Sequence, residues 1–105
     1  MKTASFFDMK PRTIPPTPKV IGEKHLDEAF DNHPNRSDDQ IFFNPEIKVK
    51  RETDTLYISK LKRSRLGFLI ATVEVHDGDK GDKAPMPIGM LSERAMLAIY
   101  LRLTA

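Results

Sequence analysis

The stretch KLKRSRLG, residues 60–67, concentrates basic side chains in a way that suits the binding of phosphate groups. Four cations lie within six positions, and an apolar run begins directly after Gly67. Lysine and arginine neutralise phosphates and release the counterions that surround a nucleic acid. An aromatic side chain beside them would offer a surface on which a base can stack. The stretch therefore predicts contact with nucleic acid, provided that the fold brings an aromatic ring and further cations alongside it.

Two strand-like segments before this stretch supply such residues. In residues 46–51 and 55–61 apolar and polar side chains alternate, as in a strand with one buried face. A short polar link joins the two segments, so an antiparallel hairpin is the simplest pairing. The polar face of this hairpin would carry two lysines and a tyrosine beside the basic stretch. The predicted binding residues are Lys48, Lys50, Tyr57, Lys60, Lys62, Arg63 and Arg65.

The same cations have a second interpretation, as a guard against aggregation. Lysines on an exposed edge hairpin prevent that edge from pairing with another chain. A protein dedicated to binding single strands also presents several aromatic rings as a rule, whereas the pattern places only Tyr57 on the predicted face. Both interpretations stay open from the residues alone, and single-stranded nucleic acid is the favoured ligand of the first.

Catalytic and metal-binding patterns are missing from the sequence. No cysteine is present, which excludes disulfides and cysteine zinc sites. The three histidines show no zinc-hydrolase spacing, and neither a phosphate-binding glycine loop nor a nucleophile elbow occurs. The acidic stretch HDGDKGDK departs from the calcium-loop pattern and contains two lysines, so residues 76–87 are expected to form a long solvated loop. We therefore expect a non-enzymatic protein without a cofactor or a bound metal.

The remaining elements complete an α+β fold. Residues 68–75 are the clearest strand and are expected to lie centrally, covered on both faces for half their length. The segment QIFFN, residues 40–44, would add a fourth strand. Residues 22–32 suit a short helix, and Ser92 suits the N-cap of a closing helix that runs to about Leu103. The predicted fold is a small antiparallel sheet of three to four strands, packed by the C-terminal helix.

A proline-rich arm precedes this domain. Four prolines between residues 11 and 18 disfavour both helix and central strand, so residues 1–21 are expected to be extended. The pattern R-x-x-P-x-x-P within the arm has the form of an SH3 ligand, although such short patterns arise freely in proline-rich segments. The predicted organisation is an extended arm over residues 1–21 and a single domain over residues 22–105.

The C-terminal helix is apolar on two sides. One stripe would face the sheet, and a second stripe lies about a third of a turn away. This is more apolar surface than one small sheet can cover, which indicates a homodimer contact or another protein partner. The predicted interface residues are Met96, Leu97, Tyr100 and Leu101. The alternative to nucleic-acid binding is therefore an interaction module or inhibitor that docks through this helix, the arm or the acidic N-terminal helix.

Charge is distributed in blocks along the chain. The formal net charge of +2 is too small to indicate a nucleic-acid binder by itself. Residues 44–66 hold seven Lys or Arg against three carboxylates, whereas residues 22–40 hold six carboxylates against two cations. The longest apolar run, residues 68–71, is far too short to span a bilayer, and charged residues interrupt any N-terminal signal segment. The sequence predicts a soluble cytoplasmic protein that has no membrane partner.

Overall fold

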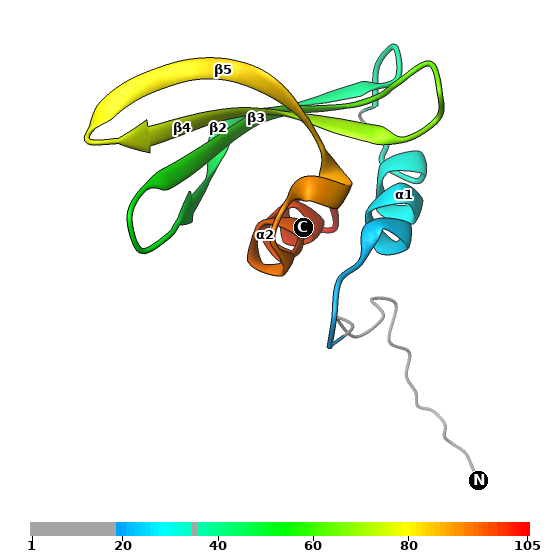
Figure 1. Cartoon of the computed structure of the whole chain (residues 1–105). Helices are drawn as coiled ribbons and strands as arrows, with labels where there is room; N and C mark the ends of the chain where they lie inside the picture. Colours follow the sequence, from blue (N-terminus) through cyan, green and yellow to red (C-terminus); the bar gives the residue numbers. More distant parts are fainter. Residues whose placement is uncertain (1–18, 35) are drawn as a thin grey trace, which may run out of the picture.

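The computed structural model describes residues 19–34 and 36–105 of the chain. The expected proline-rich arm falls almost entirely on residues 1–18, which lie outside the described residues. Figure 1 shows the elements in chain order: α1 (Glu23–Asp31), β2 (Gln40–Lys50), β3 (Thr55–Arg63), β4 (Leu69–Asp77), β5 (Asp79–Pro87), the 3-10 helix η1 (Ile88–Met90) and α2 (Glu93–Leu103). The described part of the chain is therefore α+β, as predicted.

The four strands form one antiparallel sheet in the order β2-β3-β4-β5. Each strand pairs with its neighbour in the sequence, so the sheet is a meander. Both α-helices lie on the same side of the sheet, and α2 packs against β2 (Figure 1). The prediction of a small antiparallel sheet packed by a C-terminal helix is confirmed, and the segment expected to be central forms β4, inside the sheet.

The structure differs from the sequence prediction in the two edge strands. The segment 40–44 is not a separate strand, because it continues through Pro45 to Lys50 as the single strand β2. The prediction of a long loop over residues 76–87 is wrong, because residues 79–87 form β5. The strand propensity of this segment is low, but pairing with β4 satisfies its backbone. A Cβ atom at Gly81 would collide with the carbonyl oxygen of Val75, so glycine permits this close pairing.

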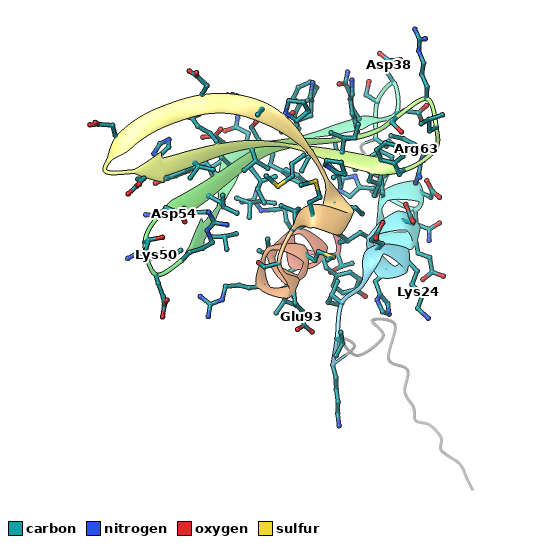
Figure 2. The ribbon with its side chains drawn as sticks, in the orientation of Figure 1. Lys24, Asp38, Lys50, Asp54, Arg63 and Glu93 are labelled. Carbon is teal, nitrogen blue, oxygen red and sulfur yellow. The ribbon has the colours of Figure 1, made fainter. Side chains whose placement is uncertain are left out.

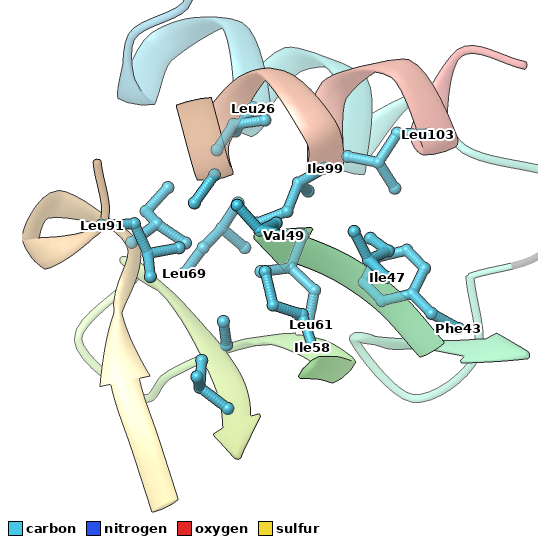
Figure 3. Packing of buried hydrophobic residues seen from close by; sticks show 14 of the residues in the cluster. Leu26, Phe43, Ile47, Val49, Ile58, Leu61, Leu69, Leu91, Ile99 and Leu103 are labelled. Atoms are coloured by element: carbon cyan, nitrogen blue, oxygen red, sulfur yellow. The ribbon is translucent and has the colours of Figure 1, made fainter. Parts of the chain in front are cut away.

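Alternation along the strands separates a core face from an opposite face. On the core face Ile47 lies opposite Ile58, which in turn lies opposite Val73. These three side chains are 5%, 0% and 2% exposed. All three belong to one cluster with apolar residues of both helices, and Figure 3 shows Ile47 and Ile58 in this cluster with Leu26 and Ile99. Full burial of a side chain of this size contributes about 1.5–3 kcal/mol, so the helix-covered face supplies the driving force for folding.

Both helices begin at a capped N-terminus. The side chain of Ser92 accepts a hydrogen bond of 3.2 Å from the backbone N–H of Ala95, which confirms Ser92 as the N-cap of α2. At α1 the backbone N–H of Gly22 donates to Nδ1 of His25 at 2.9 Å. In the described part of the chain, neither helix is long and apolar enough to cross a membrane.

Both edges of the sheet are protected against pairing with a further strand. At β2, Arg94 and Arg102 of α2 donate to the backbone carbonyls of Lys50 and Pro45 at 3.1 and 2.7 Å. At β5, two prolines interrupt the row of backbone donors that an added strand would need. Extension of the sheet is therefore a poor route for association with a second copy.

An ion pair closes the turn between β2 and β3. Arg51 donates two hydrogen bonds to Asp54, and the bond from Nη2 to Oδ2 is 2.6 Å long. These hydrogen bonds lower the pKa of the Asp54 carboxyl and raise the pKa of Arg51. Figure 2 shows Asp54 and Lys50 at this end of the sheet. The closed turn holds the register in which β2 and β3 present their side chains.

Candidate nucleic-acid interface

The face of the sheet opposite the two helices carries basic and aromatic side chains. In one row across the strands Lys48 lies opposite Tyr57, which in turn lies opposite Glu74. In a neighbouring row Phe42 lies opposite Lys60. We call this surface the open face, and the members that concern its function are Phe42, Lys48, Lys50, Tyr57, Lys60, Lys62, Glu74, His76 and Lys83. The register thus places Lys48 beside Tyr57, the arrangement that the alternation of the hairpin predicted.

A second ring packs beside Tyr57 on the open face. The centroids of the Tyr57 and His76 rings are 4.3 Å apart, and the ring planes are tilted by 37°. His76 and Glu74 are two residues apart on β4, so both point to the same face. Because Tyr57 pairs with Glu74 across β3 and β4, its ring reaches the diagonal position of His76. At this separation the two rings pack partly face to face, so each ring covers part of the other.

Glu74 is buried in spite of its place on the open face, with only 3% of its surface exposed. Nε2 of His76 lies 2.7 Å from Oε2 of this carboxylate. A carboxylate that is taken out of water requires such partners, because an unsatisfied charge is strongly unfavourable. Glu74 therefore positions the His76 ring, and neighbouring side chains shield its negative charge from a ligand on the surface.

Phe42 adds a third ring that the sequence analysis did not include. Its side chain is 65% exposed, and Nζ of Lys60 lies 5.6 Å from the ring centroid. A cation at this distance over an aromatic face is attracted by the ring. Phe42 was missed because two phenylalanines in succession hide the alternation of β2. His76 was missed because it was assigned to a loop, although continued alternation from Glu74 would have placed it on the same face.

The remaining predicted cations lie at different places around the open face. Exposed on the face itself are Lys48, Lys50 and Lys62. Arg65 is exposed in the turn between β3 and β4, at one end of the sheet. Lys83 was not among the predicted residues, and its Nζ lies 3.7 Å from Oε2 of Glu46, so this ion pair joins the two edge strands. An exposed pair of this kind contributes about 0–1 kcal/mol, and a phosphate group can replace its carboxylate at little cost.

Arg63 faces the helices, unlike the other predicted binding residues. The strand β3 extends to Arg63, so alternation directs this side chain away from the face that carries Lys62. Its guanidinium lies 3.2 Å from Asp27 and 2.8 Å from Asp31 on α1, and 5.3 Å from the centroid of the Phe30 ring. Burial lowers the pKa of Arg63, but the hydrogen bonds to the two aspartates outweigh it and raise the pKa. Figure 2 shows Arg63 at the end of the sheet beside α1.

Arg63→Ala is expected to destabilise the domain by about 1–2 kcal/mol, because two charged hydrogen bonds to partly exposed carboxylates are lost. In a domain of this size the melting temperature should fall by roughly 4–16 °C in a calorimetric scan. Lys62→Ala is the matched control, since it removes an exposed cation from the neighbouring position and should leave the melting temperature unchanged. Equal shifts for the two variants would contradict a structural role for Arg63.

The predicted partner residues of α2 divide between two sides of the helix. Met96 and Tyr100 are half-buried and pack against the core cluster. Leu97 and Leu101 are 36% and 50% exposed on the outer side of the helix. The first pair therefore stabilises the domain itself, and the second pair leaves an apolar stripe on the surface.

The acidic stretch after β4 belongs to a β-hairpin in the structure. Asp77, Asp79 and Asp82 are exposed along this hairpin. Among residues 19–34 and 36–105, no three His, Asp or Glu side chains gather closely enough to hold a metal ion.

No family model, no curated protein and no solved structure matches this chain. A function is therefore inferred from the residues of the chain itself.

Proposed function

We propose that this chain is a non-enzymatic protein that binds single-stranded nucleic acid through the open face of its sheet. The observation that supports the proposal is the pairing of cations with rings across β2 and β3. Lys48 lies opposite Tyr57, and Lys60 lies over Phe42. Phosphate binding and base stacking are thereby offered side by side on a surface that neither helix covers. The lack of cysteine fits a reducing compartment such as the cytoplasm.

Single strands are favoured over duplexes because of the rings. A lysine neutralises a phosphate whether the nucleic acid is single- or double-stranded, and it contributes affinity without selecting sequence. A ring contributes only where a base offers its flat face, which stacking on neighbouring base pairs prevents inside a duplex. Phe42 and the Tyr57–His76 pair therefore give the open face its preference for single strands.

The balance of charge on the open face supports attraction of a polyanion. The residues named for the open face include five lysines and one carboxylate, that of Glu74, and the carboxylate of Glu46 lies beside Lys83. Glu74 is buried beside His76, and Glu46 is engaged with Lys83. A phosphate backbone that crosses this face therefore meets mainly cationic groups.

Lys48→Ala combined with Lys60→Ala is expected to weaken binding of a fluorescein-labelled oligo-dT strand and to flatten its salt dependence. For single strands the slope of log K against log salt changes by about 0.7 for each phosphate contact that is lost. Fluorescence anisotropy over a salt series measures both quantities on the full chain.

The control for this pair is Lys19→Ala combined with Lys24→Ala, which removes the same charge next to the N-terminus of α1. Figure 2 shows Lys24 on that helix, away from the open face. The control pair should retain the slope of the unmodified chain. Absence of binding at low salt, or an identical slope for both double variants, would reject the open face as the phosphate-binding surface.

Homodimerisation through α2 is a second candidate function, and it is compatible with the first. The exposed stripe of Leu97 and Leu101 favours it, because large apolar side chains on the outer side of a helix are characteristic of an interface. Because contacts or prolines at both sheet edges disfavour the addition of a strand, a second copy is more readily bound through this helix. A two-fold arrangement would place the two stripes against one another and leave both open faces accessible.

Leu97→Gln combined with Leu101→Gln is expected to convert a dimer into a monomer that stays folded, since both side chains are exposed in the single chain. Size-exclusion chromatography with light scattering measures the mass over a range of concentrations. A monomeric mass for the unmodified chain at high concentration would reject the dimer.

A further inference from the structure

A cavity of about 330 Å³ lies at the β2 edge, next to the open face. Its lining includes Gln40, Phe42, Phe43, Asn44 and Arg102. Phe42 belongs both to this lining and to the open face, so the cavity and the open face are continuous. The volume falls within the range of small-molecule sites, about 300–1,000 Å³.

The lining combines flat apolar surface with hydrogen-bonding groups. Phe42 supplies an exposed ring, Phe43 and Ile41 are buried members of the lining, and the amides of Gln40 and Asn44 supply both donors and acceptors. The position of Arg102 is defined by two contacts. Its Nη1 donates to the carbonyl of Pro45 at 2.7 Å, and its guanidinium lies 5.8 Å from the Phe43 ring centroid.

The charge of the lining restricts the class of ligand. Within the described residues that line this cavity, Arg102 is accompanied by no carboxylate. Lys60 lies over Phe42, at the border between the cavity and the open face. A ligand that carries a phosphate group next to a planar polar ring matches both the positive charge of Arg102 and the position of Lys60 at the border.

We infer that this cavity receives one nucleobase of a bound single strand. The inference rests on the proposed function, since phosphates on Lys48 and Lys60 would bring the backbone past Phe42. A base is a flat ring with a hydrogen-bonding edge, which suits the phenylalanine side of the cavity and its amide groups. Asn and Gln side chains pair with the edge of adenine, and Arg pairs with that of guanine, in protein–DNA contacts. The cavity thus adds base recognition to a surface that otherwise contacts phosphates and stacks bases.

Nuclear magnetic resonance on the full chain tests this directly, because Gln40 and Asn44 each carry an NH₂ group with its own signals. Two probes are compared: an eight-nucleotide oligo-dA and an abasic strand of the same length. The oligo-dA is expected to shift the side-chain amide signals of both residues. The abasic strand should shift the backbone signals of Lys48 and Lys60 but leave the two side-chain amides unchanged.

The affinities of the Gln40→Ala variant for the two strands provide a second test. It is expected to lower the ratio of affinities for oligo-dA and the abasic strand by about 2- to 12-fold, which is the loss of one hydrogen bond. Thr53→Ala, in the turn between β2 and β3, is the control and should leave this ratio unchanged.

The outcomes separate this inference from the proposed function. If oligo-dA shifts the open face but not the two side-chain amides, or if the abasic strand shifts those amides equally, the base pocket is rejected while the proposed function stands. If neither strand shifts any signal at low salt, the proposed function fails, and the pocket fails with it.

Discussion

Alanine at both Phe42 and Tyr57 is expected to weaken binding of a single-stranded oligonucleotide by at least about 30-fold. Stacking of one base on an aromatic side chain contributes about 1–3 kcal/mol, and 1.4 kcal/mol corresponds to a tenfold change in affinity. Loss of two stacking positions therefore removes about 2 kcal/mol or more. Fluorescence anisotropy at one fixed salt concentration measures the loss, and circular dichroism verifies that the double variant is folded.

Three comparisons make this result specific to stacking. Tyr57→Phe keeps the ring and should bind like the unmodified chain. Leu66→Ala removes an apolar side chain that is 86% exposed in the turn between β3 and β4, and it should have no effect. Weak binding to a duplex should also survive the double alanine variant, because duplex bases offer no free face to the rings. A loss on the duplex as large as the loss on the single strand would contradict stacking.

The position of Lys48 and Tyr57 on one face was predictable from the sequence. Each lies in a segment where apolar and polar residues alternate, and the period of a strand is two. Burial of the intervening Val49, Leu56 and Ile58 then fixes which face is turned to solvent. The short link of residues 51–54 leaves little choice of pairing, so local patterns were sufficient to relate the two strands.

The strand β5 was not predictable in the same way. Residues 79–87 contain two prolines, a glycine and several charged residues, which are all uncommon in strands. Their strand geometry comes from pairing with β4, which is a contact between segments and not a local preference. The contact between the Tyr57 and His76 rings was not predictable for a related reason, since it depends on the register between β3 and β4.

The role of Arg63 depends on where the strand β3 ends. Alternation in the sequence predicts a strand that ends at Leu61, and the cations that follow it lie close together along the chain. In the structure the strand continues to Arg63, so successive residues point to opposite faces. The basic cluster of the sequence therefore divides between two faces. Lys62 is exposed on the open face, whereas Arg63 forms ion pairs with the acidic helix α1.

Phe30→Ala is expected to destabilise the domain by about 3–5 kcal/mol, the usual cost of removing a fully buried phenylalanine. Phe30 is 0% exposed, and the guanidinium groups of Arg36 and Arg63 lie 5.7 and 5.3 Å from its ring centroid. A small domain has a total stability of about 5–15 kcal/mol, so much of it would be lost. Urea denaturation followed by circular dichroism measures the change in the free energy of unfolding.

Phe42→Ala is the matched control, because it makes the same chemical change at a side chain that is 65% exposed. It should alter the free energy of unfolding by no more than about 0.5 kcal/mol while it weakens nucleic-acid binding. Phe30→Leu retains most of the apolar volume and should cost less than about 1.5 kcal/mol. A large effect at Phe30 would show that burial of this side chain holds α1 against the core, next to the ion pairs of Arg63 with Asp27 and Asp31. The acidic face of this helix would then stabilise the fold, and docking of another protein on it would require these ion pairs to break. Equal, small effects at Phe30 and Phe42 would instead mean that α1 is only loosely held, and docking through the acidic helix would become the stronger alternative.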